Sequence, residues 1–195
     1  MRGETSAKIG TVLPWIPVVL SFFFLFRFTE AWRAGLFLLS IAVHEGGHLA
    51  AFFFCGAGAP RLSPVPGGFR LLSPAPLSYR AELAVALAGP LSNLVPGLLF
   101  LLCGAGNAYL IEAGWIFLGA GASNLIPVSD RDGGRALLCL LSPRLGPARA
   151  ERIAAVVSLL SLSLSLILSF SLLYVSGAGF YFTVFCLFSL LSHPL

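Results

Sequence analysis

Residues 37–54 read FLLSIAVHEGGHLAAFFF, an apolar run that carries His44, Glu45 and His48 near its middle. A membrane-spanning helix needs about 20 mostly apolar residues, and the run with its flanks reaches that length. Ionisable side chains inside such a span are costly, and those that occur usually have a functional role. The stretch therefore predicts a membrane helix with a polar site inside it. The alternative is that these side chains only hydrogen-bond to neighbouring helices.

The composition of the whole chain agrees with a membrane protein. Of its 195 residues, 57% are hydrophobic and only 10% are charged, whereas a soluble domain has about a quarter charged residues. We expect one domain over residues 1–195, embedded in the lipid bilayer. The net charge of +4 is not gathered in a basic patch, so we expect no nucleic-acid partner. The four cysteines form no C-x-x-C pair and are typical of small buried hydrophobic residues.

The hydropathy pattern predicts an all-α polytopic membrane protein. We expect six membrane helices, at about residues 11–26, 34–55, 82–103, 108–128, 153–174 and 178–191. Most basic residues fall in the N-terminus and in the connections 56–81 and 129–152, and the positive-inside rule then places both termini and the polar site toward the cytoplasm. Serine and leucine alternate in residues 158–173, but an unpaired strand is not viable in lipid, so a helix is expected there.

The segment 56–80 differs from the rest because it is rich in proline, glycine and serine. Pro66, Gly67 and Gly68 predict a turn between two short runs. A flexible loop and a short membrane-associated β-hairpin are both compatible with this pattern. In the second case the hairpin edge can pair with an extended peptide, and Gly67 and Gly68 are then candidate substrate-binding residues.

The spacing within HEGGH predicts a metal site. His44 and His48 are four residues apart, which is about 400° of helical rotation, so both imidazoles project from one face of the helix. Two imidazoles at this spacing can bind one zinc ion. Glu45 lies beside them and can reach a water molecule at the metal without being a ligand, which is the physical basis of the H-E-x-x-H motif.

A catalytic zinc usually has three protein ligands, so a third one is needed. The remaining candidates are His193, Glu82, Glu112, Asp130 and Asp132. His193 is more simply explained as a residue at a span end. Pro127 ends regular helix before the two aspartates, and the Gly-Gly pair after Asp132 allows close backbone approach. Spacing alone does not choose between Asp130 and Asp132.

Three motifs in this order resemble the site-2 protease family, whose members are intramembrane zinc metalloproteases. They are HEGGH, AGPLSN at residues 88–93 and NLIPVSDRDGGR at residues 124–135, and the resemblance extends over residues 34–152. The resemblance implies that His44, His48 and Asp132 are the zinc ligands and that Glu45 is the general base. It further implies that Asn124 helps to hold the substrate or the oxyanion, and that Asn93 is a substrate-binding polar residue.

The resemblance also implies an architecture and a class of substrate. We expect neither a PDZ nor a CBS domain, and the chain is then similar to the minimal sporulation branch, the stage IV sporulation protein FB type. Such enzymes cleave a membrane-tethered protein, such as a pro-sigma or anti-sigma factor, in regulated intramembrane proteolysis at a bacterial cell membrane. A membrane regulatory partner and a second copy of the chain are both compatible with the sequence as further partners. The chain departs from the family at residues 129–131, where Ser-Asp-Arg replaces apolar residues and a proline.

A non-catalytic membrane protein is the competing interpretation, either a metal transporter or an inactive protease-like scaffold. Transporters often contain internal repeats with broken helices in corresponding places. The sequence shows no convincing repeat, and neither the base nor a ligand of the expected site is missing. The protease is therefore favoured.

Overall fold

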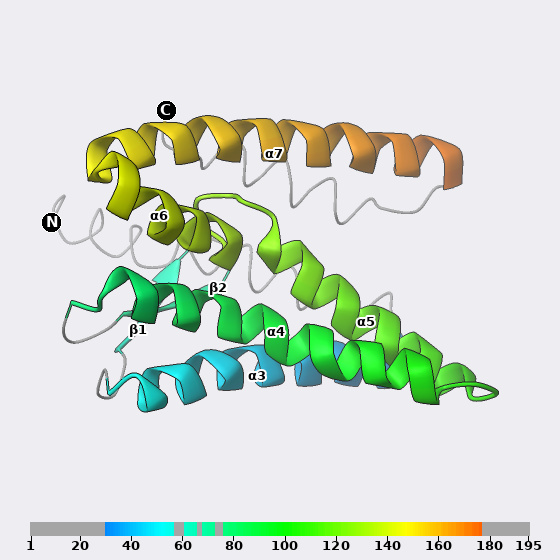
Figure 1. The fold of residues 1–195 in the computed structure, drawn as a ribbon. Helices are drawn as coiled ribbons and strands as arrows, with labels where there is room; N and C mark the ends of the chain where they lie inside the picture. Colours follow the sequence, from blue (N-terminus) through cyan, green and yellow to red (C-terminus); the bar gives the residue numbers. More distant parts are fainter. Residues whose placement is uncertain (1–29, 57–60, 66–67, 73–75, 177–195) are drawn as a thin grey trace, which may run out of the picture.

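The computed structural model describes residues 30–56, 61–65, 68–72 and 76–176. The predicted spans at 11–26 and 178–191 lie outside these residues, as do Gly67 and His193. The elements in chain order are α3 (Ala31–Phe54), β1 (Arg61–Val65), β2 (Gly68–Leu72), α4 (Tyr79–Cys103), α5 (Ala108–Leu125), α6 (Asp132–Leu145) and α7 (Pro147–Ser176) (Figure 1).

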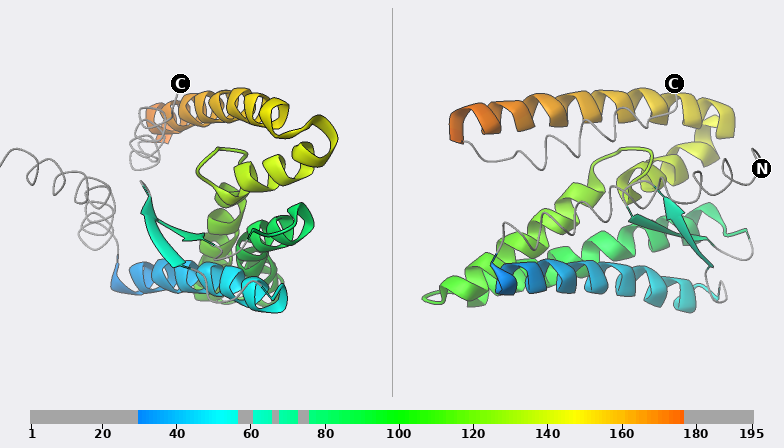
Figure 2. Two further views of the ribbon diagram at one scale, coloured as in Figure 1. Left: turned by 90° about the vertical axis from the view of Figure 1, so that its left-hand side faces the viewer. Right: turned by 180° about the vertical axis from the view of Figure 1, so that it is seen from behind.

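Helix α4 is at the centre of the described part of the chain. It packs against α3, α5 and α6, while α7 packs against α6. The views in Figures 1 and 2 agree that α3 and α7 lie on opposite outer sides, with α4 and α6 between them. The arrangement brings α3, which carries HEGGH, close to the start of α6.

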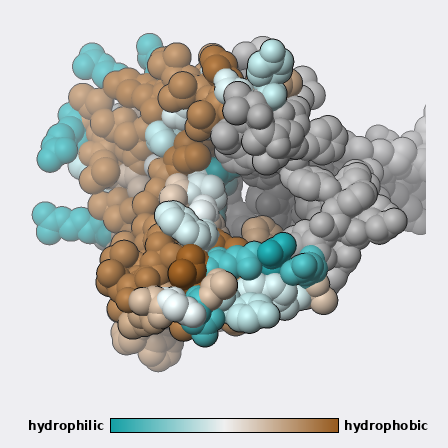
Figure 3. All heavy atoms as spheres, turned by 90° about the vertical axis from the view of Figure 1, so that its right-hand side faces the viewer, coloured by the Kyte–Doolittle hydropathy of each residue, from teal (hydrophilic) through white to brown (hydrophobic). Residues whose placement is uncertain are grey.

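Three of the described helices are long and apolar enough to cross a membrane, namely α3, α4 and α7. Helix α5 covers the predicted fourth span but ends at Leu125 and is not among the three. Six spans therefore stay a prediction. Large apolar side chains lie on the outside, with Leu102 69% and Leu164 68% exposed, and Figure 3 shows apolar atoms over much of the described surface. Exposed apolar faces of this kind are stable against lipid.

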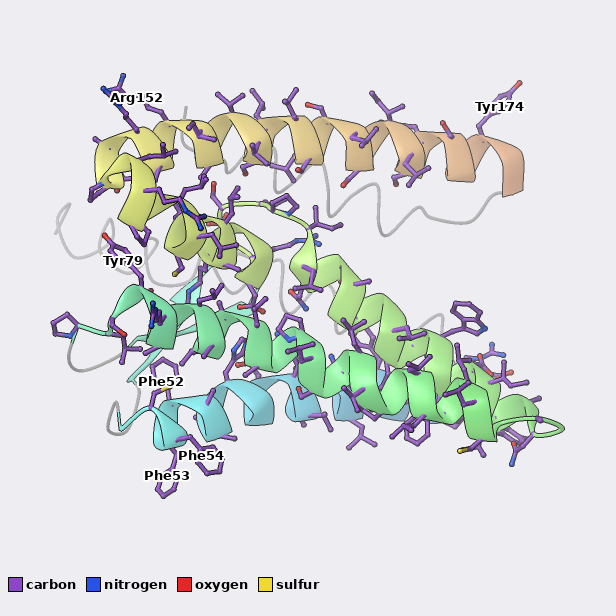
Figure 4. All side chains as sticks on the ribbon, in the orientation of Figure 1. Phe52, Phe53, Phe54, Tyr79, Arg152 and Tyr174 are labelled. Carbon is purple, nitrogen blue, oxygen red and sulfur yellow. The ribbon has the colours of Figure 1, made fainter. Side chains whose placement is uncertain are left out.

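Helix α3 has a buried face and a face that points away from the protein. Phe52 is 1% exposed and points toward α4, whereas Phe53 and Phe54 are 81% and 85% exposed and point outward (Figure 4). The helix ends at Phe54, and Gly56 follows with a φ of 65°, a conformation that glycine adopts without steric cost. The buried face includes both histidines of HEGGH.

Helix α7 carries polar anchors at its two ends. Arg152 lies near the start and Tyr174 near the end, and both point outward in Figure 4. Arginine and tyrosine are residue types that favour the interface between lipid and water. Between them the segment rich in serine and leucine is helical, as its sequence predicts.

The segment after α3 contains two short strands. β1 and β2 pair antiparallel, from Arg61 opposite Leu72 to Val65 opposite Gly68. The two residues that join them, 66 and 67, lie outside the described residues. The association of this strand pair with a membrane, and its pairing with a substrate, stay predictions.

The segment 129–152 differs from its prediction. The hydropathy pattern predicts a connection between spans here, but the segment contains α6 and the first turns of α7. A hydropathy pattern detects only long apolar runs. Helix α6 contains arginines and a Gly-Gly pair and is too polar to be recognised in this way. Asp132 is the first residue of α6.

Candidate metal centre

Three side chains from two helices meet inside the protein. The Nε2 atom of His44 lies 3.0 Å from Oδ2 of Asp132, and the Nε2 atom of His48 lies 3.2 Å from the same oxygen. The two Nε2 atoms are 3.2 Å apart. All three side chains are nearly buried, with 5% to 9% of each residue exposed. One nitrogen of each ring and one carboxylate oxygen therefore converge on a single point.

This cluster fits a zinc ion. Zinc bonds to histidine nitrogen and carboxylate oxygen are about 2.0–2.2 Å long and tetrahedral, which separates two ligand atoms by about 3.4 Å. The observed separations of 3.0 to 3.2 Å are close to that value. The cluster is the only group of three or more potential metal ligands found in the described part of the chain. Three ligands from the protein leave a fourth position for water or substrate, as in catalytic zinc sites.

The ring of His48 is held from two sides by α4. Its Nδ1 lies 2.8 Å from the carbonyl oxygen of Val85, which fixes the tautomer with Nδ1–H as donor and leaves Nε2 free to bind metal. Gly89, one turn further along α4, contacts the same ring, because a Cβ atom built at this position would overlap its atoms. Helix α4 therefore sets the position of a candidate ligand that belongs to α3.

The two glycines after Asp132 allow α6 to start where it does. A Cβ atom on Gly133 would overlap the carbonyl group of Leu125, and one on Gly134 would overlap that of Val128. The first turn of α6 thus lies directly on the turn that follows α5. Burial disfavours the ionised form of Asp132, but the two imidazoles that face its carboxylate outweigh that effect and lower its pKa to about 2. The carboxylate is thus charged at neutral pH, as a metal ligand must be.

The other carboxylates that the sequence left open lie elsewhere. Glu112 forms an ion pair with Arg33, and Glu82 lies 3.7 Å from Arg135. Asp130 is exposed and is not part of the cluster. Of the carboxylates considered as a third ligand, only Asp132 therefore lies beside the two histidines.

The remaining candidate residues have different surroundings. Glu45 is half-buried on α3, next to His44 in the chain. Asn124 is half-buried near the end of α5, and its Nδ2 donates to the Ala120 carbonyl oxygen at 3.1 Å. Asn93 is 1% exposed on α4, and neither of its amide atoms has a partner among the described residues. Gly68 begins β2 and pairs with Val65.

Two known proteins from Methanocaldococcus jannaschii are similar to this chain. The zinc metalloprotease MJ0392 is 30% identical over 128 residues, which cover 62% of this chain and 37% of that protein. The solved structure of a site-2 protease from the same organism matches with a TM-score of 0.64 and 26% identity, over 90% of this chain and 84% of that one. Both likenesses support a place for this chain in the site-2 protease family.

The likeness to a site-2 protease agrees with the three apolar helices, and together they support a membrane protein. No protein-family model matches the chain. The chain spans only 37% of the length of the curated relative that it matches.

Sequence reasoning missed the contribution of α4 to this site. The carbonyl of Val85 carries no side-chain signal, so no motif could have revealed it. The pair Gly89-Pro90 in AGPLSN did carry a signal, because a glycine inside an apolar helix often marks a close approach. What it approaches, the ring of His48, is visible only in the tertiary structure.

Proposed function

We propose that this protein is a zinc-dependent intramembrane endopeptidase. It hydrolyses a peptide bond in or near the transmembrane segment of a membrane-tethered protein. The observation that carries the proposal is the convergence of His44, His48 and Asp132 within 3.2 Å of one another on an apolar, span-length helix and its neighbour. The likeness to a zinc metalloprotease and to a site-2 protease supports it.

The roles of the residues follow from their positions. His44, His48 and Asp132 would hold the zinc ion. When bound, zinc acts as a Lewis acid that polarises the scissile carbonyl and lowers the pKa of a water molecule toward about 7. Val85 holds His48 in the tautomer that ligation requires. The burial of the cluster excludes bulk water, which strengthens each electrostatic interaction within it.

Glu45 is the proposed general base. It directly follows a ligand on α3 and is half-buried, so it lies next to the cluster without being a member of it. Its carboxylate takes a proton from the attacking water and passes it to the leaving amine. Asn124 is proposed to donate a hydrogen bond from its side-chain amide to the oxyanion. In this structure its Nδ2 donates one hydrogen to the Ala120 carbonyl oxygen of its own helix, and the second N–H of the same group is the proposed donor to the oxyanion.

The substrate must present an extended peptide. A helical span hides its carbonyl groups in hydrogen bonds, so the bond to be cut has to unwind first. We propose that an edge of the β1–β2 pair, which includes Gly68, holds the extended segment by strand addition. A pro-sigma or anti-sigma factor is one substrate of this class.

The orientation follows from the distribution of arginines. Arg144, Arg149 and Arg152 are exposed around the junction of α6 and α7, and the positive-inside rule places this end toward the cytoplasm. A reporter fused after Gly106, in the turn between α4 and α5, should then read out on the opposite side. A cytoplasmic readout there would refute the orientation.

The test of the proposed activity compares three proteins purified in detergent: wild type, Glu45→Gln and Glu82→Gln. Each is assayed for bound zinc and for cleavage of a single-span reporter whose span contains glycine and proline. Wild type and Glu82→Gln should bind about one zinc per chain and cleave the reporter. Glu45→Gln should bind the same amount of zinc and cleave at least about 100-fold more slowly, because it lacks the base but keeps the ligands.

The outcome also separates the competing interpretations. Equal cleavage by Glu45→Gln and wild type would refute the mechanism. Zinc binding without cleavage of any single-span reporter by the wild type would favour the transporter or inactive scaffold. Failure of the wild type to bind zinc would refute the metal site itself.

A further inference from the structure

Only two residues in the described part of the chain have buried side-chain nitrogen or oxygen atoms without a hydrogen-bond partner. They are His44, through Nδ1, and Asn93, through both atoms of its amide. Buried polar groups are almost always hydrogen-bonded, so each of these exceptions needs an explanation. His44 belongs to the metal cluster, and the question is whether Asn93 does as well.

Contacts between α3 and α4 place the two residues at the same level. The hydroxyl of Ser92, which precedes Asn93, donates to the carbonyl oxygen of Val43, which precedes His44, at 2.9 Å. A Cβ atom on Gly47 would lie only 2.6 Å from that hydroxyl oxygen, so the two helices are in close contact here. His44 and Asn93 are each one residue beyond this contact.

The faces of the two helices also correspond. Val85, Gly89 and Asn93 follow one another at intervals of four residues and share a face of α4. The first two already contact His48, one through its carbonyl and the other through its missing Cβ. One turn further along this face comes Asn93. One turn back along α3 from His48 comes His44. Because the two helices are antiparallel, His44 is at the level of Asn93, just as His48 is at the level of Val85 and Gly89.

The two groups are chemically complementary. A histidine that binds metal through Nε2 keeps its proton on Nδ1, and such rings almost always donate this N–H to an oxygen. His48 donates to Val85 in this way, whereas His44 has no acceptor among the described residues. The Asn93 side chain offers an acceptor oxygen that is otherwise unused.

We propose that Asn93 is a positioning residue for the metal centre. Its amide oxygen accepts a hydrogen bond from Nδ1–H of His44, directly or through one buried water, and thereby fixes the ring in the orientation that ligation needs. This inference rests on the proposed zinc site. It assigns Asn93 a task in metal binding, whereas the sequence suggested contact with the substrate.

The test measures zinc affinity, which substrate contacts do not influence. The full chain is purified in detergent as wild type, Asn93→Leu, Asn93→Asp and the neighbouring control Ser92→Ala. Each is titrated with zinc against a chromophoric chelator, and cobalt is bound to record the absorption of the metal site. Asn93→Leu should lower zinc affinity about 10- to 100-fold and alter the cobalt spectrum. Asn93→Asp keeps an acceptor and should bind zinc more tightly than Asn93→Leu, while Ser92→Ala should bind as wild type does.

Each result bears on a different claim. Wild-type zinc affinity in Asn93→Leu would overturn the inference, and a raised KM with unchanged zinc affinity would identify Asn93 as a substrate-binding residue. Zinc binding by Asn93→Asp as weak as that of Asn93→Leu would also overturn it. If Asn93→Leu does not fold, as judged by circular dichroism, the smaller Asn93→Ala takes its place with the same expectation. Failure of the wild type to bind zinc would instead refute the proposed function.

Discussion

The substitution Gly89→Ala tests whether α4 controls the metal centre. A Cβ atom at this position would lie 2.5 Å from Cε1 and 2.8 Å from Cδ2 of the His48 ring. Carbon atoms in contact prefer about 3.5–4.0 Å, so the ring has to move by roughly 1 Å. It cannot move freely, because its Nδ1 is bonded to the carbonyl of Val85 on the same helix.

A displacement of this size should abolish normal ligation. Metal–ligand distances tolerate deviations of only about 0.2 Å, and a misplacement of about 1 Å in a catalytic site costs about 100-fold in rate. We therefore expect Gly89→Ala to bind zinc at least about 10-fold more weakly and to cleave a single-span reporter about 100-fold more slowly than wild type. Zinc affinity is measured by chelator competition in detergent, and helix content by circular dichroism.

The matched control is Gly46→Ala, which introduces the same methyl group within HEGGH. A Cβ atom on Gly46 would have nothing within 4 Å, so zinc affinity and cleavage should be those of wild type. The control should be slightly more stable, by about 0.5–1 kcal/mol, because alanine favours a helix more than glycine does. Equal zinc affinities of Gly89→Ala and Gly46→Ala would refute the reasoning that α4 positions His48.

Three further results are expected. Asp132→Ala should lose bound zinc while Asp130→Ala retains it, as measured by metal analysis, because only the first is in the cluster; retention by Asp132→Ala would move the ligand assignment to Asp130. Zinc affinity should fall as pH decreases from about 8 to 5, because the ligands must lose their protons to bind; a pH-independent affinity would argue against histidine ligation. Burial raises the pKa of Cys139 to about 11, so this thiol stays protonated at pH 8. It should react with iodoacetamide more slowly than the exposed Cys103, as followed by mass spectrometry. Equal reaction rates of the two thiols would contradict the burial of Cys139.

The sequence predicted the helices that are visible as apolar runs and missed the one that is not. Residues 34–55 and 82–103 were predicted as spans, and α3 and α4 cover them. Such runs are recognisable because the bilayer demands about 20 apolar residues regardless of context. Helix α6 has no such constraint, since it is short, carries two arginines and packs between α4 and α7.

What the sequence determined by itself is the chemistry of α3. Four residues of spacing on one helix fix two imidazoles on one face, and this geometry is local, so it needs no knowledge of the rest of the chain. The third candidate ligand depends on a contact across 88 residues of sequence, between His44 and Asp132. Spacing left Asp130 and Asp132 equivalent, because a distance along the chain does not set a distance in space.

The tertiary structure made that choice through close packing of backbone. Gly133 and Gly134 let the start of α6 lie on the turn after α5, which directs Asp132 inward and leaves Asp130 exposed. In the same way Gly89 makes room for the ring of His48. The sequence thus specified a pair of candidate ligands and a candidate base. Which carboxylate joins them was decided by which backbone segments can approach one another.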